Sequence, residues 1–381
     1  MKVSYDAAVI GAGIVGAACA YELSCAGMST AIIEAGTVGG GATSAGMGHV
    51  VIMDDSPAQF ALTRYAQSLW NEVAPGLPPE AEYNRCGTLW IAADGEEMRE
   101  VYRKQALFAS TGIIAEILDQ QALAEAEPNL CRPLAGALRV PSDAVLHAPC
   151  AAAYLISLAQ KAGAALHLGT RVISASHGSV LLDNDSTIST KHIVHATGAS
   201  AAQLVPQLPI RKRKGHVVVT DDYPNFIHHQ IVELGYLKSA HSIAADSVAF
   251  NVQPRRSGRL LIGSSREFDQ ESAEINETIL AAMLARATDY MPALHSLSDF
   301  RVSTGFRAAT PDKLPLIGPT EDPTVFLATG HEGLGITTSL ATARLLADHL
   351  LHRESAIPLD PYLPERFVTE GLLFERQAAK S

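Results

Sequence analysis

The first apolar stretch of the chain is followed by a glycine-rich turn and then by a helical pattern. The run 7–10 predicts a buried strand, and the spacing of Ala17, Ala20 and Leu23 predicts a helix that packs against a sheet. A second apolar run, 30–33, ends on an acid. The pattern predicts a strand–helix–strand unit, and therefore parallel sheet structure of the α/β class at the start of the chain.

The pattern then alternates between helical and strand-like segments as far as residue 199. Apolar residues at helical spacing predict helices over 58–73, 95–110, 119–126 and 149–162. Apolar runs predict strands over 87–92, 165–168, 171–175 and 192–196, with a candidate hairpin beginning at Ser179. The last of these strands ends in a turn of small residues, the kind of turn that brings backbone close to a nucleotide.

A β-rich region follows and is closed by a helix. Strands are predicted over 215–220, 230–238, 247–253 and 259–264, followed by an amphipathic helix over 273–290. Beyond it the sequence predicts a loop and short strand over 304–319, a strand over 325–329, a turn, and a final helix over 339–351. A mixed sheet inserted between dinucleotide-binding segments predicts an α+β substrate domain.

The turn after the first strand carries the glycine spacing of a dinucleotide fingerprint. Gly11 permits a tight turn, Gly13 lets the backbone approach a pyrophosphate, and Gly16 allows close packing of helix on strand. The helix N-terminus would present unpaired N–H groups to the phosphates. Glu34 stands at the distance from Gly16 expected of the acid that binds a ribose. The alternative is a glycine-rich turn in an unrelated α/β protein.

A second glycine-rich stretch, 36–49, follows the acid directly. So many glycines predict a backbone that wraps closely around a ligand, and the alternative is a flexible loop. Within this stretch, Thr43 and Ser44 could donate hydroxyl hydrogen bonds to phosphate.

Composition and charge exclude several classes of protein. The chain has 381 residues, 47% hydrophobic and 18% charged, as in an ordinary enzyme of two domains. A net charge of -11 and the lack of a basic run argue against nucleic acid as a partner. The 5 cysteines have no metal-ligand spacing, which predicts reduced thiols, a cytoplasmic protein and no bound metal. The apolar stretch 7–20 is too short to span a bilayer, so no stable membrane insertion is expected.

Five motifs in order resemble the D-amino acid oxidase-like family of FAD enzymes, also called the glycine/sarcosine oxidase family. They are GAGIVG, GGGATSAGMG, HATGA, GFRAATPDKLPLIGP and GHEGLGI. The resemblance implies non-covalent FAD and a Rossmann-like FAD-binding domain interleaved with a mixed-sheet substrate domain. It implies an FAD-binding domain made of 1–80, 143–205 and 308–367, and a substrate domain made of 81–142 and 206–307.

The resemblance also implies the residues that bind FAD. These are Gly11, Gly13, Ile14, Val15, Gly16, Glu34, Ala35, Ala42, Thr43, Ser44, Gly46, Met47, Val172, Thr197, Gly198, Arg307, Gly330, Gly333, Leu334, Gly335, Ile336 and Thr337. The last turn would place a helix N-terminus beside the flavin and stabilise negative charge there during reduction.

Arg307 matches the family arginine that pairs with a substrate carboxylate. Its planar fork can hold a carboxylate by two hydrogen bonds, and the alternative is a structural salt bridge. Met47 and His49 are expected to line the substrate site, and His49 and His331 are candidate bases for a substrate ammonium. For each histidine the alternative is packing or orientation of the backbone.

The chain departs from the oxidases of the family at three places. The strand around 250–255 lacks the tyrosine that often contacts substrate, and Gly333 stands where glycine oxidase has a bulky cation. No cysteine occurs in 307–311, where sarcosine oxidase attaches its flavin. These departures argue against a covalent flavin and put efficient use of oxygen in doubt.

Three functions remain open at this point. The favoured one is an FAD-dependent dehydrogenase acting on a small cyclic or secondary amino acid, with D-hydroxyproline as the substrate that the resemblance favours. In that case partner redox subunits are expected, and they could bring the chain to a membrane. The alternatives are an autonomous amino-acid or amine oxidase that produces hydrogen peroxide, and a flavin-carrying subunit without its own active site.

Overall fold

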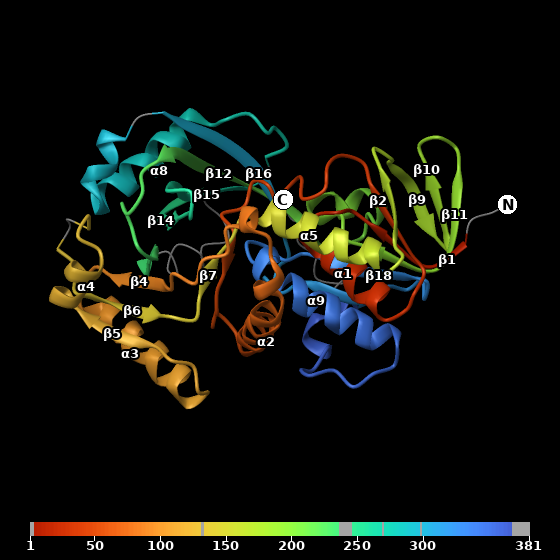
Figure 1. The fold of residues 1–381 in the computed structure, drawn as a ribbon, viewed down its shortest axis with the longest axis horizontal. Coiled ribbons are helices and arrows are strands. Elements are labelled where there is room, and N and C mark those ends of the chain that lie inside the picture. Colours follow the sequence, from red (N-terminus) through yellow and green to blue (C-terminus); the bar gives the residue numbers. More distant parts are fainter. Residues whose placement is uncertain (1–3, 131–132, 236–245, 269, 298, 368–381) are drawn as a thin grey trace, which may run out of the picture.

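The computed structural model describes residues 4–130, 133–235, 246–268, 270–297 and 299–367. Within them the strands form two eight-stranded sheets and one short two-stranded pair. Figure 1 shows the two large sheets side by side, joined through the central helices.

The first sheet is mainly parallel and is built on the N-terminal unit. Its order is β17-β18-β11-β1-β2-β8, and the hairpin of β9 and β10 pairs with β11. The strands are β1 (Ser4–Ile10), β2 (Thr30–Glu34), β8 (Ala165–Leu168), β9 (Val172–Ser176), β10 (Ser179–Leu182), β11 (Thr187–His195), β17 (Leu316–Pro319) and β18 (Val325–Thr329). The predicted strand–helix–strand unit and α/β class are confirmed, because β1 pairs in parallel with both β2 and β11.

Four helices cover one face of this sheet. They are α1 (Ile14–Cys25), α2 (Pro57–Val73), α5 (Ala148–Lys161) and α9 (Gly335–Leu350). Their apolar residues form one core with β1, β2 and β11. Ala17, Ala18 and Ala20 of α1 are fully buried, because small side chains let neighbouring helices approach closely. The opposite face is covered by the β9–β10 hairpin.

The second sheet has the order β16-β12-β15-β14-β13-β4-β6-β5. Its strands are β4 (Thr88–Ala92), β5 (Glu116–Asp119), β6 (Gly136–Val140), β12 (Arg211–Asp222), β13 (Gln230–Glu233), β14 (Ser247–Pro254), β15 (Arg259–Phe268) and β16 (Phe300–Ala309). Helix α8 (Glu277–Tyr290) packs on one face, where Phe250 and Tyr290 stack with ring centroids 4.8 Å apart. Helices α3 (Gly95–Ser110) and α4 (Gln120–Ala126) lie near β4, β5 and β6.

Some predicted boundaries were wrong. The last helix begins at Gly335 rather than 339, because the turn before it leads directly into the helix at Leu334. Helix α8 begins at Glu277 rather than 273, because the side chain of Asn276 accepts hydrogen bonds from Thr278 N and Ile279 N and caps it.

Several strands had no apolar pattern that predicted them. β5 is a mostly exposed edge strand. β16 runs for 10 residues, whereas a loop and short strand were expected over 304–319 and no element was expected over 300–303. β6 and the short pair β3 (His49–Val50) and β7 (Ala144–Val145) were also missed. The strand predicted over 230–238 forms over Gln230–Glu233, and residues 236–238 lie outside the described residues.

The interleaved division of the chain remains a proposal. Strands between residues 88 and 140 and between 211 and 309 belong to the second sheet, and the other strands of the two large sheets belong to the first. We propose the predicted segments as the two domains, with β16 continuing two residues past the boundary at 307.

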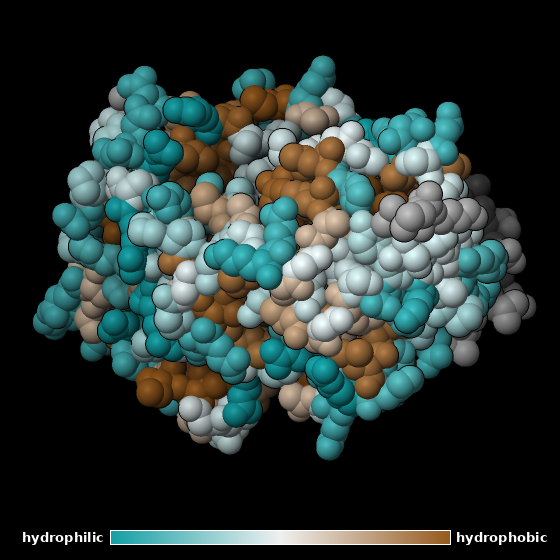
Figure 2. Space-filling model, turned by 45° about the vertical axis from the view of Figure 1, so that its right-hand side comes forward, coloured by the Kyte–Doolittle hydropathy of each residue, from teal (hydrophilic) through white to brown (hydrophobic). Residues whose placement is uncertain are grey.

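Hydrophilic and hydrophobic residues are interspersed on the face shown in Figure 2. Among the described residues, no helix combines the length and the apolar character needed to cross a bilayer.

Candidate functional site

A cavity of about 930 Å³ lies where the carboxyl ends of the parallel strands meet the face of the second sheet. Its walls include Ile10 at the end of β1, Glu34 at the end of β2 and Ala328 on β18. Ligands of parallel α/β sheets bind at this edge. The volume is at the upper end of the range for small-ligand and cofactor sites.

The glycines after β1 form the first wall. Gly11 has φ 102°, and a Cβ there would lie 2.6 Å from Ala196 O. A Cβ on Gly16 would lie 2.0 Å from Gly11 O, so this position allows the helix to pack on the turn. Gly13 faces the cavity, and a Cβ on it would come within 3.2 Å of Thr43 Oγ1. The wall at this point is therefore bare backbone at the start of α1.

The second glycine-rich stretch folds over this helix start. Ile14 N donates a hydrogen bond to Thr43 Oγ1 over 3.0 Å, which leaves the hydroxyl proton of Thr43 available as a donor. Ser44 Oγ donates to Gly41 O. On the other side, the Glu34 carboxylate accepts from Ala12 N and Gly36 N, each over 2.7 Å. Each carboxylate oxygen has further acceptor capacity for a ribose.

The cavity brings together most of the residues predicted from the sequence. Its walls contain Gly11, Gly13, Ile14, Val15, Glu34, Ala35, Ala42, Thr43, Ser44, Gly46, Met47, His49, Val172, Thr197, Gly198, Arg307, His331, Gly333, Leu334, Gly335 and Ile336.

Gly16, Gly330 and Thr337 of the predicted set lie behind the wall. Gly330 has φ 78° and shapes the turn before α9. Thr337 Oγ1 donates to His49 O over 2.9 Å and fixes the loop that carries His49. These three positions support the site without lining it.

The turn 330–334 joins the two sheets through a buried ion pair. Arg213 on β12 donates to Glu332 Oε1 over 2.6 Å, and the guanidinium lies 4.5 Å from the Phe268 ring centroid. Glu332 N also donates to Ala308 O. The turn is therefore held against the second sheet just before α9, whose N-terminus has no side-chain cap and whose first residues, Gly335 and Ile336, line the cavity.

His49 is held as a neutral ring. Its Nε2 lies 3.2 Å from Gly333 O and its Nδ1 lies 3.4 Å from Gln253 Nε2. A carbonyl can only accept and an amide nitrogen can only donate, so Nε2 carries the proton. Burial, together with the nearby charges of Arg307 and Arg255, lowers the pKa of His49 to about 4, against the effect of the Gly333 carbonyl.

His331 is turned toward the helix behind the wall. Its Nε2 lies 2.9 Å from Thr342 Oγ1 of α9, and burial lowers its pKa to about 3. Both rings are therefore deprotonated at neutral pH, and both have contacts that orient the backbone. These contacts favour a positioning role over the role of base.

The Arg307 guanidinium lies over a gap in the second sheet. A Cβ on Gly215 of β12 would meet Arg307 Nη1 at 2.5 Å and Nη2 at 2.8 Å. Nη1 donates to Ser265 O of β15 over 3.0 Å. The glycine in the middle of a strand makes room for the guanidinium at the cavity wall.

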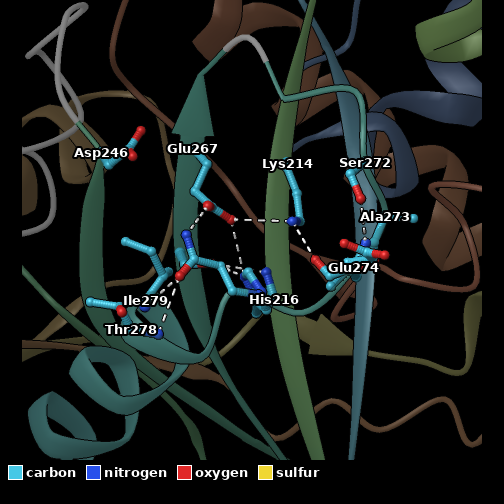
Figure 3. Close-up of polar contacts among 12 residues, drawn as sticks. Lys214, His216, Asp246, Glu267, Ser272, Ala273, Glu274, Thr278 and Ile279 are labelled. Atoms are coloured by element: carbon cyan, nitrogen blue, oxygen red, sulfur yellow. Dashed lines mark hydrogen bonds and ion pairs between the residues drawn. The ribbon is translucent and has the colours of Figure 1, made fainter.

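A buried polar cluster lies next to Ser265 (Figure 3). Glu267 lies between Lys214 Nζ at 3.9 Å and His216 Nδ1 at 3.5 Å, and it accepts from Asn276 Nδ2 over 2.7 Å. His216 Nδ1 also lies 3.0 Å from Ser265 Oγ, and Asn276 N donates to His216 Nε2 over 3.0 Å.

The cluster fixes a short segment that forms part of the cavity wall. Lys214 Nζ donates to Glu274 O, and Thr304 Oγ1 donates to Ala273 O. Ala273 itself lines the cavity. The cluster thus fixes both the strand beneath Arg307 and the wall segment beside it.

Further residues that support the cavity wall were not predicted from the sequence. A Cβ on Gly263 would meet Met47 Sδ at 2.8 Å, and one on Gly305 would meet Ala45 Cβ at 2.3 Å. Buried Arg255 donates to Met47 O over 2.6 Å and to Leu146 O. For Gly263 a signal was available, because it lies inside the predicted strand 259–264, and a glycine in a strand interior marks a close approach by another group. Gly305 lies in the segment expected as a loop and short strand, and Arg255 had no such signal.

A family model described as FAD dependent oxidoreductase, DAO, matches residues 6–349. The chain belongs to this family. The structure of the protein and the comparisons together confirm the fold class and the FAD cofactor expected from the motifs.

Three similar proteins illustrate the range of the family. Glycine oxidase from Geobacillus kaustophilus is 29% identical, with 96% of this chain and 97% of that protein covered. Hydrogen cyanide synthase subunit HcnC from Pseudomonas aeruginosa is 26% identical, with 97% and 98% covered. The crystal structure of L-proline dehydrogenase from P. horikoshii superimposes with a TM-score of 0.88 at 22% identity, covering 97% of this chain and 99% of that one.

The residues in the cavity fit FAD. The glycine turn and the start of α1 offer backbone N–H groups to a pyrophosphate, and Glu34 offers a carboxylate to a ribose. None of the cysteines in the described part of the chain lines the cavity, and the non-covalent attachment of the flavin stays a prediction. No group of side chains able to hold a metal ion occurs among the described residues.

Proposed function

We propose that the chain is the FAD subunit of a dehydrogenase that oxidises the Cα–N bond of a small cyclic or secondary amino acid to the imine, with D-hydroxyproline as the favoured substrate. The observation that carries the proposal is the position of Arg307. Its guanidinium lies over Gly215 at the wall of the cavity that fits the flavin, where a planar fork can bind a carboxylate.

The residues of the chain bind and orient the substrate. Arg307 anchors the carboxylate, and His49 and Gly333 form a neutral surface at the cavity wall beside it. Buried Gln253, which does not line the cavity, fixes the His49 ring. When bound, FAD supplies the acceptor for the hydride that leaves Cα. The substrate reacts with its amine neutral, and the ammonium proton is lost to solvent, because His49 with a pKa of about 4 is too weak a base to hold it.

Partner subunits are part of this proposal. One relative, 26% identical, is by its name a subunit of hydrogen cyanide synthase. The described residues hold no metal-binding group that could pass electrons onward. The electrons therefore need an acceptor outside the described chain, and a partner redox subunit would supply one.

An oxidase that reduces oxygen directly is the second candidate, because the relative at 29% identity is a glycine oxidase. The two functions differ in reoxidation. The purified chain should be reduced by its substrate without air and then be reoxidised much faster by an artificial dye than by air. Reoxidation by air as fast as reduction would make the enzyme an oxidase.

A further inference from the structure

Six polar side chains in the cavity wall have buried oxygen atoms with no hydrogen-bond partner in the described part of the chain. Three of these atoms, Gln59 Oε1, Thr197 Oγ1 and Glu332 Oε2, lie on helix α2 or on turns next to the first sheet. The other three lie on strands of the second sheet and are Gln230 Oε1, Asn251 Oδ1 and Ser264 Oγ. Gln230 and Ser264 are only 3% and 6% exposed. A buried acceptor left without a donor is destabilising, so such groups in a ligand cavity indicate a donor on the ligand.

The three residues of the second sheet form a row across neighbouring strands. Ser264 on β15 is adjacent in sequence to Ser265, whose carbonyl accepts from Arg307. Asn251 on β14 pairs with Gly263, and it also pairs with Val232 on β13, two residues from Gln230. Strands are spaced about 4.8 Å apart, so Asn251 and Gln230 lie successively farther from the guanidinium.

A substrate whose carboxylate binds Arg307 would have the opposite end of the molecule beside Asn251 and Gln230. The acceptors Asn251 and Gln230 are uncharged amides, so they cannot balance a second ammonium group. A neutral hydroxyl can donate to either of them. The carboxylate and the hydroxyl would then be recognised at opposite ends of one small molecule.

We infer that Asn251 and Gln230 determine specificity for a hydroxylated amino acid, by accepting a hydrogen bond from a hydroxyl at the end of the substrate opposite its carboxylate. This inference rests on the proposed function and adds the residues that recognise the substrate side chain.

The test compares hydroxyproline with proline. Anaerobic flavin reduction is measured with 4-hydroxyproline, in the stereoisomer that the native protein accepts, and with the matching proline enantiomer. In the native protein the flavin should be reduced by the hydroxylated substrate more efficiently than by proline, by roughly tenfold or more. This ratio is the effect expected of one buried hydrogen bond. Asn251→Leu and Gln230→Met should each reduce the preference, and the double variant should bring it close to one.

Ile231→Val is the matched control. Ile231 follows Gln230 on the same strand, but its side chain is buried in the core of the second sheet and does not line the cavity. The substitution should leave the ratio of the two substrates as in the native protein. The visible spectrum of bound FAD shows in each case that the variant is folded.

A binding measurement provides a readout that does not depend on turnover. Tetrahydrofuran-2-carboxylate and its 4-hydroxy derivative have a ring oxygen in place of the amine. Calorimetry should show tighter binding of the hydroxylated probe to the native protein, by roughly tenfold, and equal binding of the two probes to the double variant.

The outcomes separate this inference from the proposed function. If no amino acid reduces the flavin, the proposed function fails. If proline and hydroxyproline reduce it equally well, or if the double variant keeps the native preference in both measurements, the function stands and the assignment of Asn251 and Gln230 is overturned.

Discussion

The two sheets build their halves of the cavity by different means. At the ends of β1 and β2 the wall is mostly backbone, because glycines leave N–H groups exposed to the cavity. One acid, Glu34 at the end of β2, adds a carboxylate to this wall. Across β12–β16 the wall is made of side chains, such as Arg307, that lie over glycine gaps such as Gly215. A backbone wall suits a cofactor common to a whole family, and a wall of side chains can change with the substrate.

The largest effect is expected in the backbone wall. Gly13→Val should abolish FAD binding, because a branched side chain would fill the space where the backbone approaches the pyrophosphate and would crowd Thr43. The purified variant should be colourless, whereas acid precipitation of the native protein should release yellow flavin into the supernatant.

Gly95→Ala is the matched glycine control. A Cβ on Gly95 would meet nothing within 4 Å, and this residue begins α3 away from the cavity. The variant should keep its flavin. A Gly13→Val protein that remains yellow would show that the pyrophosphate does not lie at this turn.

The second largest effect is expected from a substitution at Arg307, in the wall formed by side chains. Arg307→Ala should keep FAD and lose roughly 2 to 5 kcal/mol of transition-state binding, a decrease in kcat/KM of more than about tenfold. Arg307→Lys should recover only part of it, because an ammonium cannot form the fork. Steady-state kinetics with a dye acceptor measures both, and near-native kcat/KM in the alanine variant would place the carboxylate anchor elsewhere.

A smaller effect is expected from Gly215→Ala, which fills the gap beneath the Arg307 guanidinium. Gly215→Ala places a methyl group 2.5 Å from Arg307 Nη1, so the guanidinium must move. The variant should keep its flavin and raise KM for the substrate by roughly tenfold, since misplaced binding groups weaken binding before they abolish it. An unchanged KM would mean that the substrate does not depend on the position of Arg307.

These differences explain how much could be predicted from the sequence. Gly11, Gly13 and Glu34 lie within one unit of the chain, so their spacing alone predicted a dinucleotide site. The strand–helix alternation predicted the α/β class for the same reason.

The side-chain wall gave a much weaker signal. Gly215 and Arg307 are 92 positions apart in sequence and meet only because β12 pairs with β16. Arg307 was found through resemblance, whereas Gly215, Arg255 and the cluster around Glu267 had no local pattern. The edge strand β5 was missed because most of its residues are exposed.

The smallest expected effect concerns His49, whose substitution should leave the pH at which kcat/KM rises unchanged. The pKa of His49 is lowered to about 4, so the ring is already deprotonated above pH 5 and cannot cause a break near neutrality. kcat/KM should rise with pH as the substrate ammonium loses its proton, and His49→Gln should leave the position of that break unchanged while lowering its height. A break that moves or vanishes in the variant would make His49 the base.

The most direct test of the account is anaerobic reduction of the bound flavin by a panel of amino acids, followed in a stopped-flow spectrometer. The panel contains glycine, sarcosine, both enantiomers of proline and the stereoisomers of 4-hydroxyproline. We expect rapid bleaching by a cyclic secondary amino acid, fastest for a hydroxyproline, and slow bleaching by glycine. Bleaching by glycine faster than by any cyclic amino acid, or a flavin that stays oxidised throughout the panel, would contradict the proposed function.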